Sequence, residues 1–403
     1  MKIGIITNLY PPYVRGGAEH VVVRTVEALT ELYPEHEVFV ISTHPRKKGV
    51  DPIRDSISTE RVYRFFPRNL YYVLDDHKWP WPLRIIWHFI DAYCFCGARR
   101  VGEVLDKEKP DVVITHNLKG IGLRIPRAIQ KRKIPHVHIM HDLQLLFPSG
   151  LKFFGHERDS WYASLCYLEY RRVCRMRLGK PDLIVFPSKY LHDEYSKFGF
   201  GKSAKMIVMP NPAPQMKTVQ RSNRSDGDLR LLFVGQLEQH KGVKFLLQTL
   251  KDIPGDVHLI FAGEGTCAGR VEKAAAKNKH ISYLGYISMD HLVNCLGMAD
   301  ALVVPSLCYE NSPTVIYEAL QAGVPVIASD IGGVGELVED GKNGFLFTPG
   351  DSKDFLRAIE CLNARRDEFF DAQDKIKETV APYALASYTK ALVEKLVDIV
   401  QNK

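Results

Sequence analysis

The sequence predicts an α/β protein built from two doubly wound parallel sheets, one in each half of the chain. A length of 403 residues accommodates two or three domains at ~150 residues each. Short apolar runs alternate with amphipathic stretches in both halves, as in parallel sheets with crossover helices. A polar, proline-bearing stretch at 211–228 separates the halves and reads as a linker. Two such Rossmann-like domains are expected to face a central cleft.

The expected strands of the first half are short apolar runs that end in polar or turn residues. They are Ile3–Thr7, Glu37–Ser42, Asp111–Thr115, His136–Met140, Leu183–Pro187 and Met206–Met209. Ligands of open α/β sheets bind beyond the carboxyl ends of the strands, so the residues that follow the strands are the first site candidates. These are Asn8 to Glu19, His116 and Asn117, His141 and Asp142, and Ser188.

The strand pattern restarts after the linker. The expected strands are Arg230–Val234, His258–Ala262, Ile281–Leu284, Ala301–Pro305, Val324–Ala328 and Gly344–Thr348. We therefore place one domain at residues 1–210 and a second at 211–384. The final amphipathic stretch, Tyr388 to Val400, predicts a helix at about 385–403. This helix can pack on either half, and we expect it to return to the first.

Positive charge is concentrated in the first half. Residues 1–210 hold 33 lysines and arginines against 22 aspartates and glutamates, a net charge of +11, while the remainder is net −4. This asymmetry suggests an anionic partner, such as a phospholipid surface or a pyrophosphate-linked acceptor. We expect no nucleic-acid partner, because no aromatic-basic signature accompanies the charge.

Two stretches raise the question of a membrane surface. Residues 83–105 are rich in aromatics with polar residues at helical spacing, which favours a core helix over one that lies on a membrane. Residues 167–180 carry Arg171, Arg172, Arg175, Arg177 and Lys180. A solvated helix face is the favoured interpretation of these cations, and a dock for anionic lipid is the alternative.

Cysteine usage and the lack of long apolar runs suggest a cytoplasmic protein. The eight cysteines show no Cys-x-x-Cys pair, so we expect reduced thiols rather than a zinc site or disulfides. No run reaches the ~18 apolar residues of a membrane span, and the start of the chain lacks the apolar region of a secretory signal. We expect a soluble protein, at most peripheral on the inner face of the cytoplasmic membrane.

Glycines after the first strand predict a ligand-binding loop. Gly16 and Gly17 stand between that strand and a helical pattern. Adjacent glycines let backbone amides approach a phosphate or sugar, and the helix presents its positive end there. A purely structural turn is the alternative.

Two further strand ends carry charged groups suited to a diphosphate. Lys241, followed by Gly242, places an ammonium where a helix begins. After the strand at 301–305, Ser312 is expected to cap a helix whose first turn holds Pro313 and whose free amides lie near Thr314. Glu310 precedes this helix, and Glu318 lies one turn beyond Thr314.

Other patterns are set aside. Asp226-Gly227-Asp228 is a D-x-D, which can hold a metal, but a solvated turn in the linker is favoured. Gly263-Glu264-Gly265 lacks the third glycine of a dinucleotide fingerprint. Asp75-Asp76-His77 reads as loop surface rather than a metal cluster.

These motifs resemble glycosyltransferase family 4, a retaining group with the GT-B fold. The family's two glutamates, separated by seven residues, match Glu310 and Glu318. The other matching pieces follow the family's order along nearly the whole chain: Gly16-Gly17, His141-Asp142, Pro210-Asn211-Pro212, Lys241-Gly242, Gly263-Glu264-Gly265, Ala299-Asp300, Pro305-Ser306, Gly332-Gly333-Val334-Gly335-Glu336 and Asn343-Gly344-Phe345. One departure stands out, since the arginine that follows the strand-ending glycine in the family is here Gln236.

The resemblance implies a role for each matching residue. Glu310 would contact the donor sugar, Glu318 the ribose and Lys241 the diphosphate, with His141 beside the reacting centre. The remaining donor-binding positions it implies are Gly16, Gly17, Gln236, Gly263, Tyr286, Ile287, Ser312, Pro313, Thr314 and Val315. The strand-end residues Glu19, His116 and Asn117 are the expected acceptor contacts in the first domain.

The implied activity is retaining transfer of a hexose-type sugar from a UDP- or GDP-sugar, without metal or cofactor, to a lipid-linked or cell-surface glycan precursor. Front-face displacement is favoured over two-step nucleophilic chemistry, and stabilisation of the leaving group is expected to contribute most to catalysis. Three alternatives stay open. They are a sugar-phosphate synthase with a soluble acceptor, a relative that hydrolyses or epimerises nucleotide sugars, and a non-catalytic nucleotide-sugar-binding protein, which Gln236 makes conceivable.

Overall fold

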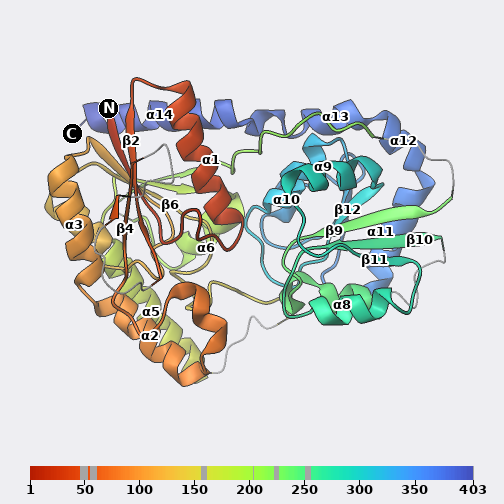
Figure 1. The fold of residues 1–403 in the computed structure, drawn as a ribbon, viewed down its shortest axis with the longest axis horizontal. Coiled ribbons are helices and arrows are strands. Elements are labelled where there is room, and N and C mark those ends of the chain that lie inside the picture. The colour runs from red at the N-terminus through yellow and green to blue at the C-terminus, as the bar shows by residue number, and fades with distance from the viewer. Residues whose placement is uncertain are drawn as a thin grey trace. The chain divides into compact units, whose positions relative to one another are not determined.

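A computed structural model describes residues 1–45, 53–54, 61–155, 161–202, 204–221, 227–249 and 256–402, with backbone only at 53–54 and 161–163. It divides into two compact units (Figure 1). The first comprises residues 1–151, 159–212 and 385–403, and the second comprises 152–158 and 213–384. No helix among the described residues is long and apolar enough to cross a membrane.

The first unit is a doubly wound sheet with strand order β3-β4-β2-β1-β5-β6-β7-β8. Every pairing is parallel except that of β3 with β4 at one edge. Its strands are β1 Lys2–Ile6, β2 Glu37–Thr43, β3 Ile53–Arg54, β4 Arg61–Phe65, β5 Val112–Thr115, β6 His136–Ile139, β7 Leu183–Phe186 and β8 Lys205–Val208. The order reverses between β1 and β5, which makes that position the switch point of the sheet.

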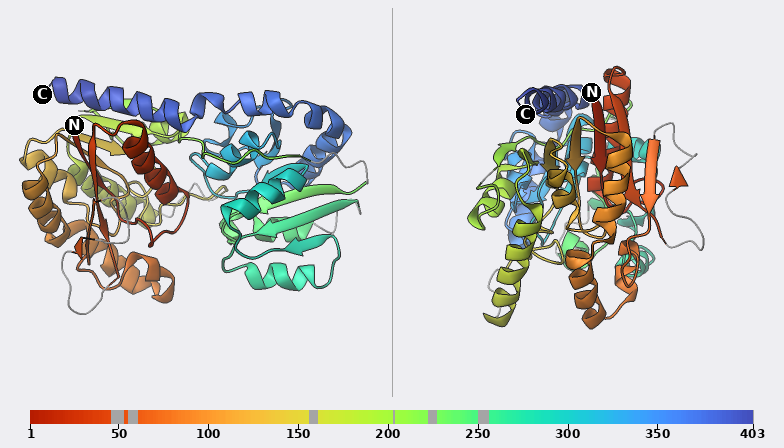
Figure 2. Two further views of the ribbon diagram at one scale, coloured as in Figure 1. Left: turned by 45° about the horizontal axis from the view of Figure 1, so that its top comes forward. Right: turned by 90° about the vertical axis from the view of Figure 1, so that its left-hand side faces the viewer.

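The helices of the first unit include the last helix of the chain. They are α1 Gly17–Leu32, the 3₁₀ helix η1 Val73–Lys78, α2 Trp81–Tyr93, α3 Cys96–Glu108, α4 Ile125–Lys131, α5 Trp161–Leu178, α6 Lys189–Lys197 and α14 Leu385–Gln401. Figures 1 and 2 show α14 crossing α1, and the two helices are in contact. Leu392 and Leu396 of α14 are fully buried in one cluster with Val22 and Val26 of α1. Burial of each leucine stabilises the docked helix by roughly 1.5–3 kcal/mol.

The second unit is a six-stranded, fully parallel sheet with order β11-β10-β9-β12-β13-β14. Its strands are β9 Leu229–Val234, β10 Val257–Ala262, β11 Ile281–Tyr283, β12 Ala301–Val304, β13 Val326–Ser329 and β14 Gly344–Phe347. In order of appearance this is 3-2-1-4-5-6, the Rossmann arrangement, with the switch point between β9 and β12. Strands such as β12 and β13 are buried along their whole length, because helices cover both faces of a parallel sheet.

The helices of the second unit follow its strands. They are η2 Gln239–Lys241, α7 Val243–Thr249, α8 Ala268–Ala275, α9 Met289–Met298, α10 Thr314–Gln321, η3 Val334–Glu336, α11 Ser352–Ala364, α12 Arg366–Asp371, α13 Gln373–Glu378 and η4 Ala381–Tyr383. One apolar cluster runs through the unit on both sides of the sheet. Every strand expected from the sequence is present, with ends shifted by at most two residues, and among the described residues the strands β3 and β4 were not expected.

Three local expectations were wrong. The stretch 83–105 is two helices, α2 and α3, broken where Cys94 adopts an extended backbone. The outer face of α2 is exposed rather than in the core. Residues 213–221 do not form a solvated linker, since Ala213 and Val219 join the core of the second unit. The guanidinium of Arg221 there donates to the carbonyl oxygens of Ala299 and Gly323.

Candidate active site

The loops after β9 and β12 meet at the switch point of the second unit. The amide of Leu307 donates to the carbonyl of His240 over 2.8 Å. Gly242 lies in the left-handed region at φ +80°, and a Cβ atom there would be 1.9 Å from the carbonyl oxygen of Pro305. Glycine at 242 therefore permits the contact that brings Lys241 beside the end of β12.

Lys241 and Glu310 form an ion pair at this point. The Lys241 Nζ lies 2.6 Å from Glu310 Oε1, and the Ser306 hydroxyl donates to the same oxygen over 2.7 Å. The side chain of Glu310 is 13% exposed and that of Lys241 30% exposed, so solvent still reaches the ammonium. Two charge-assisted donors on one carboxylate oxygen fix its direction.

The electrostatics of the pair keep both groups ionised. Burial alone raises the pKa of Glu310, but the charge and hydrogen bond of Lys241, together with the Ser306 hydrogen bond and the His240 charge, outweigh burial and hold that pKa below its ordinary value. Burial likewise lowers the pKa of Lys241, but the charge and hydrogen bond of Glu310, together with Cys308, more than compensate, so the pKa of the ammonium is raised. Glu310 is thus an acceptor of hydrogen bonds near neutral pH and has no proton to donate.

The backbone of Glu310 is held from the loop after β13. The amide of Gly333 donates to the Glu310 carbonyl over 2.8 Å. Gly332 has φ +66°, and a Cβ atom there would be 2.1 Å from the same carbonyl oxygen. A side chain at position 332 would collide with this carbonyl oxygen, so the loop needs glycine there.

Helix α10 starts one residue later than the sequence suggested. Its N-cap is Pro313, and the helix proper begins at Thr314. Ser312 is not the cap, because its hydroxyl shares a 2.8 Å hydrogen bond with the hydroxyl of Tyr317. The first N–H groups of a helix lack intrahelical partners, so the amides of Thr314 and Val315 suit an anion. Glu318, one turn further on, is buried.

Close glycine contacts set the neighbouring strand ends. Gly263 has φ +137°, and a Cβ atom there would be 1.9 Å from the Gly235 carbonyl oxygen. The Gly263 amide donates to the Gly285 carbonyl over 2.7 Å, which ties the ends of β10 and β11 together. Gln236 follows Gly235 and is exposed, as is Tyr286, while Ile287 is half-buried. Solvent therefore reaches these three residues, which follow the carboxyl ends of β9 and β11.

In the first unit, the glycine loop precedes α1 as expected. Gly16 is the N-cap of α1, and its amide donates to the Glu19 carboxylate over 2.8 Å. Glu19 is buried, and burial raises its pKa above the ordinary value. Glu19 therefore completes a capping contact that holds Gly16 and Gly17 in place.

His116 and His141, at the ends of β5 and β6, are in direct contact. Their rings stack at 5.1 Å between centroids, with His116 Nδ1 and His141 Nε2 2.8 Å apart. Burial lowers the pKa of His141 to about 4 and that of His116 well below its ordinary value. Both imidazoles are therefore neutral near pH 7, and one donates to the other.

Some residues around these groups had not been singled out as site candidates. Gln144 donates to the Asn117 side chain and accepts from the amide of Lys119 over 3.0 Å, which fixes the loop after β5. Its place two residues after Asp142 was the available signal. Ser306, which holds Glu310, directly follows the strand-ending Pro305. Strand-end position alone points to both residues.

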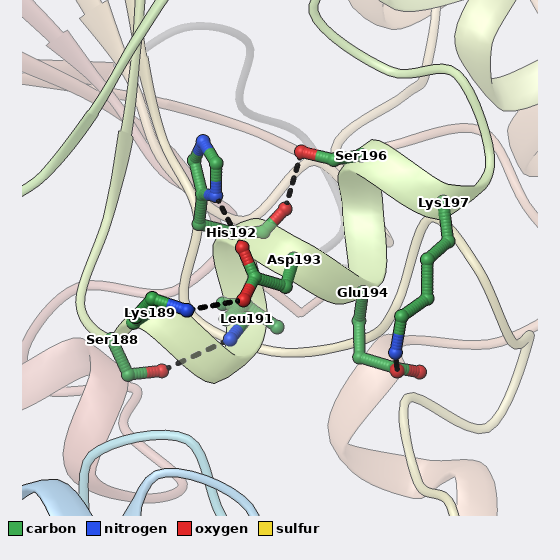
Figure 3. Close-up of polar contacts among 8 residues, drawn as sticks. All are labelled: Ser188, Lys189, Leu191, His192, Asp193, Glu194, Ser196 and Lys197. Atoms are coloured by element: carbon green, nitrogen blue, oxygen red, sulfur yellow. Dashed lines mark hydrogen bonds and ion pairs between the residues drawn. The ribbon is translucent and has the colours of Figure 1, made fainter.

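Ser188, a strand-end candidate, has a structural role. Figure 3 shows it at the start of α6, where its hydroxyl accepts from the Leu191 amide over 3.2 Å. The same view shows Asp193 contacted by Lys189 and His192, and Glu194 by Lys197. Ser188 is therefore an N-cap, and such caps stabilise a helix by ~1 kcal/mol.

The patterns considered for metal binding fall in different units, and Asp228 of the D-x-D pattern lies just before the amino end of β9 in the second. Asp226 falls outside the described residues. Potential ligand atoms lie within 4.8 Å of one another on Asp228, His258 and His280. These residues stand at the amino ends of β9, β10 and β11, whereas Lys241 and Glu310 follow the carboxyl ends of β9 and β12. Asp75 pairs with Lys78 at 2.7 Å in η1, in keeping with a surface loop.

Both units match families of known proteins. Residues 15–214 match the family described as "Glycosyltransferase Family 4", and residues 215–378 match "Glycosyl transferases group 1". The chain is 28% identical over 338 residues to an uncharacterised 42.6 kDa protein in the cps region of Klebsiella pneumoniae, covering 84% of this chain and 87% of that one. It is 29% identical over 378 residues to glycogen synthase of Mycobacterium tuberculosis, covering 90% and 86%.

A third relative and two solved structures extend the comparison. The putative teichuronic acid biosynthesis glycosyltransferase TuaC of Bacillus subtilis is 25% identical over 422 residues, covering 97% of each chain. Sucrose-phosphate synthase from Thermosynechococcus elongatus superposes with a TM-score of 0.75 at 18% identity, covering 100% of both chains. Anabaena HepE in complex with UDP-glucose gives 0.67 at 19% identity, covering 99% of this chain and 100% of that one. With two Rossmann-like units and both halves matched, the chain belongs to the family 4 glycosyltransferases of the GT-B type.

Proposed function

We propose that this glycosyltransferase moves a hexose from a nucleoside diphosphate hexose to an acceptor hydroxyl with retention at the anomeric carbon, and that it needs no metal ion. The observation that carries the proposal is the Lys241–Glu310 pair beside the amino end of α10 at a sheet switch point. An ammonium and helix amides suit a diphosphate, and an ionised carboxylate beside them suits sugar hydroxyls.

The donor assignment rests on chemistry at the second unit. Lys241 Nζ has three donors, of which one reaches Glu310, so the ammonium can hold Glu310 and a phosphate oxygen together. The amides of Thr314 and Val315 supply further donors, and Glu318 follows one turn later for the ribose. The fold match to a protein solved with UDP-glucose supports a uridine donor as the first to test.

The proposed reaction is a front-face displacement. The bond from the anomeric carbon to the diphosphate oxygen breaks, and the acceptor oxygen forms its bond on the same face. The acceptor proton passes to the departing diphosphate oxygen, so no enzyme base is consumed. Lys241 and the α10 amides stabilise the charge that develops on the leaving group, which is the largest expected contribution. Glu310 positions the sugar, in keeping with its lowered pKa.

The acceptor is proposed to be a lipid-linked or cell-surface glycan precursor. One relative is described as a protein in a cps region, and another as a putative teichuronic acid biosynthesis glycosyltransferase. In the first unit, the neutral His116–His141 pair and the first amides of α1, which follow Gly16, supply uncharged and backbone donors suited to a sugar hydroxyl.

The test is a transfer assay on the full-length protein with UDP-, GDP- and ADP-hexoses. Each donor is incubated with a membrane-extract acceptor, with a simple sugar phosphate or with no acceptor, and products are identified by mass spectrometry. We expect sugar transfer from a single nucleotide class to an acceptor in the membrane extract. NMR of the product should show that the anomeric configuration of the donor is retained. Inversion would refute retention, and transfer to the sugar phosphate alone would refute the glycan acceptor. Tight donor binding with neither transfer nor hydrolysis would refute the enzymatic function.

A further inference from the structure

Helix α2 exposes an apolar face where a surface helix is normally polar. Four large side chains stand at every fourth position along that face, with exposed fractions of 39–72%: Trp81, Ile85, Phe89 and Tyr93. The opposite face is also apolar in part, since Trp87 and Ala92 are buried in the unit. At 1.5 Å per residue, the exposed stripe is roughly 18 Å long. Its length and continuity set it apart from the scattered apolar residues of ordinary surfaces.

Further large apolar side chains are exposed on neighbouring segments of the same unit. Trp79 and Phe95 flank α2 and are exposed, as are Leu165, Leu168 and Met176 of α5. The Arg177 guanidinium of α5 lies 5.1 Å from the ring centroid of Tyr93, which joins the ends of the two helices. Figure 1 and the right-hand view of Figure 2 show α2 and α5 projecting at the same end of the unit. We call the exposed apolar side chains of residues 79–95 and α5 the apolar face.

Cations are interspersed with the apolar face. Helix α5 carries four arginines and one glutamate, and Arg172 and Arg175 are exposed. Arg84 of α2 and Lys78 before it are each paired with an aspartate, at 3.8 Å to Asp76 and 2.7 Å to Asp75. The net positive charge comes from α5, where four arginines stand against the single glutamate Glu169, which lies 3.6 Å from Arg172. Asp91 of α2 is buried. The surface is therefore apolar and basic together.

We propose that this apolar face, with the basic residues of α5, lies in the headgroup region of an anionic bilayer, with α2 parallel to the membrane plane. Tryptophan, tyrosine and phenylalanine are the side chains that favour this interface, and arginines beside them pair with lipid phosphates. A second copy of the chain fits less well, since a symmetric contact would bring the arginines of two α5 helices against one another. The proposal does not depend on the identity of donor or acceptor.

The test is sedimentation of the full-length protein with phosphatidylcholine vesicles, with and without phosphatidylglycerol. Wild type is expected to bind only the anionic vesicles and to be released by high salt. The double variant Ile85→Ser/Phe89→Ser removes two side chains of the stripe and should weaken binding by tenfold or more, because each large apolar group transferred contributes strongly. Arg172→Ser should weaken binding by about fivefold.

The matched control is Leu32→Ser, which removes an exposed leucine from α1 in the same unit. It should bind like wild type, and all variants should keep the thermal midpoint and the donor-hydrolysis or transfer rate in detergent-free buffer. Absence of wild-type binding to anionic vesicles would overturn the proposal. So would a double variant that binds like wild type, or light scattering that shows a dimer dissociated by Ile85→Ser/Phe89→Ser. Activity lost from wild type under all conditions would instead count against the proposed function.

Discussion

Replacement of Glu310 by glutamine separates sugar positioning from nucleotide binding. The substitution keeps an oxygen acceptor for Lys241 and Ser306 but removes the charge from a carboxylate that accepts at 2.6 and 2.7 Å. Hydrogen bonds to charged groups contribute about 1.5–3 kcal/mol and neutral ones about 1, so the two contacts together lose about 1–2 kcal/mol after screening at the partly exposed Lys241. We expect the free energy of unfolding to fall by that amount at neutral pH.

The pH dependence gives this prediction a definite sign. The pKa of Glu310 is lowered in the folded state from its ordinary value of 4.5, so the stabilisation is complete above 4.5. It is lost as the pH falls from 4.5 through the lowered folded value. The difference in unfolding free energy between wild type and Glu310→Gln, measured by urea titration, should therefore shrink in acid. A difference that stays constant from neutral pH into that acid range would refute the ion-pair assignment.

Function should respond more strongly than stability. Because the lost contacts are proposed to be with the sugar, turnover should fall by roughly 10²–10³-fold, the scale of one transition-state contact. Binding of the free nucleoside diphosphate, measured by calorimetry, should be unchanged or tighter, since Lys241 no longer shares its charge with a carboxylate. Equal losses in turnover and in nucleotide affinity would refute the proposed role of Glu310.

Three further predictions concern the same unit. Glu318→Ala should weaken binding of the free nucleoside diphosphate, as measured by calorimetry. An equal loss of affinity for a phosphate compound that has no ribose would contradict the ribose contact. Gln236→Arg should tighten diphosphate binding by up to about tenfold through a charge-assisted contact without necessarily raising turnover, and unchanged affinity would show that position 236 does not reach the phosphates. Turnover should survive excess chelator, and a loss of turnover that manganese restores would contradict metal independence. In that case the Asp228→Ala variant would show whether the metal binds at the cluster of Asp228, His258 and His280.

Most strands could be predicted because they are buried on both faces and so appear as short apolar runs. Strand β4 could not, because Arg61 and Arg64 interrupt its apolar pattern. Arg61 is paired with Glu37 and Glu108, and the buried Arg64 donates to the carbonyls of Tyr10 and Pro11. Those partners lie far along the chain, so the local sequence does not show how the arginines are satisfied.

The sequence predicted which residues belong to the candidate site, but it did not predict which of them contact one another. Lys241 and Glu310 were both singled out, yet their ion pair joins positions 69 apart, which only the folded sheet brings together. The role of Ser312 was mistaken, because capping preference was weighed without the Tyr317 hydroxyl that engages it. The prediction of a core helix at 83–105 was wrong for another reason. Periodicity identifies an apolar face but does not show whether the rest of the fold covers that face.

The contribution of Lys241 to leaving-group stabilisation is tested most directly by Lys241→Ala. Nucleoside diphosphate binding and single-turnover rates would be measured at fixed salt, with Lys244→Ala as the control because Lys244 is an exposed lysine three residues further on. We expect Lys241→Ala to lose at least about tenfold in affinity and 10²-fold in rate, the scale of one lost charge-assisted contact to the phosphates, with the control unchanged. Near-normal values for Lys241→Ala would show that another cation holds the diphosphate and would contradict the proposed leaving-group site.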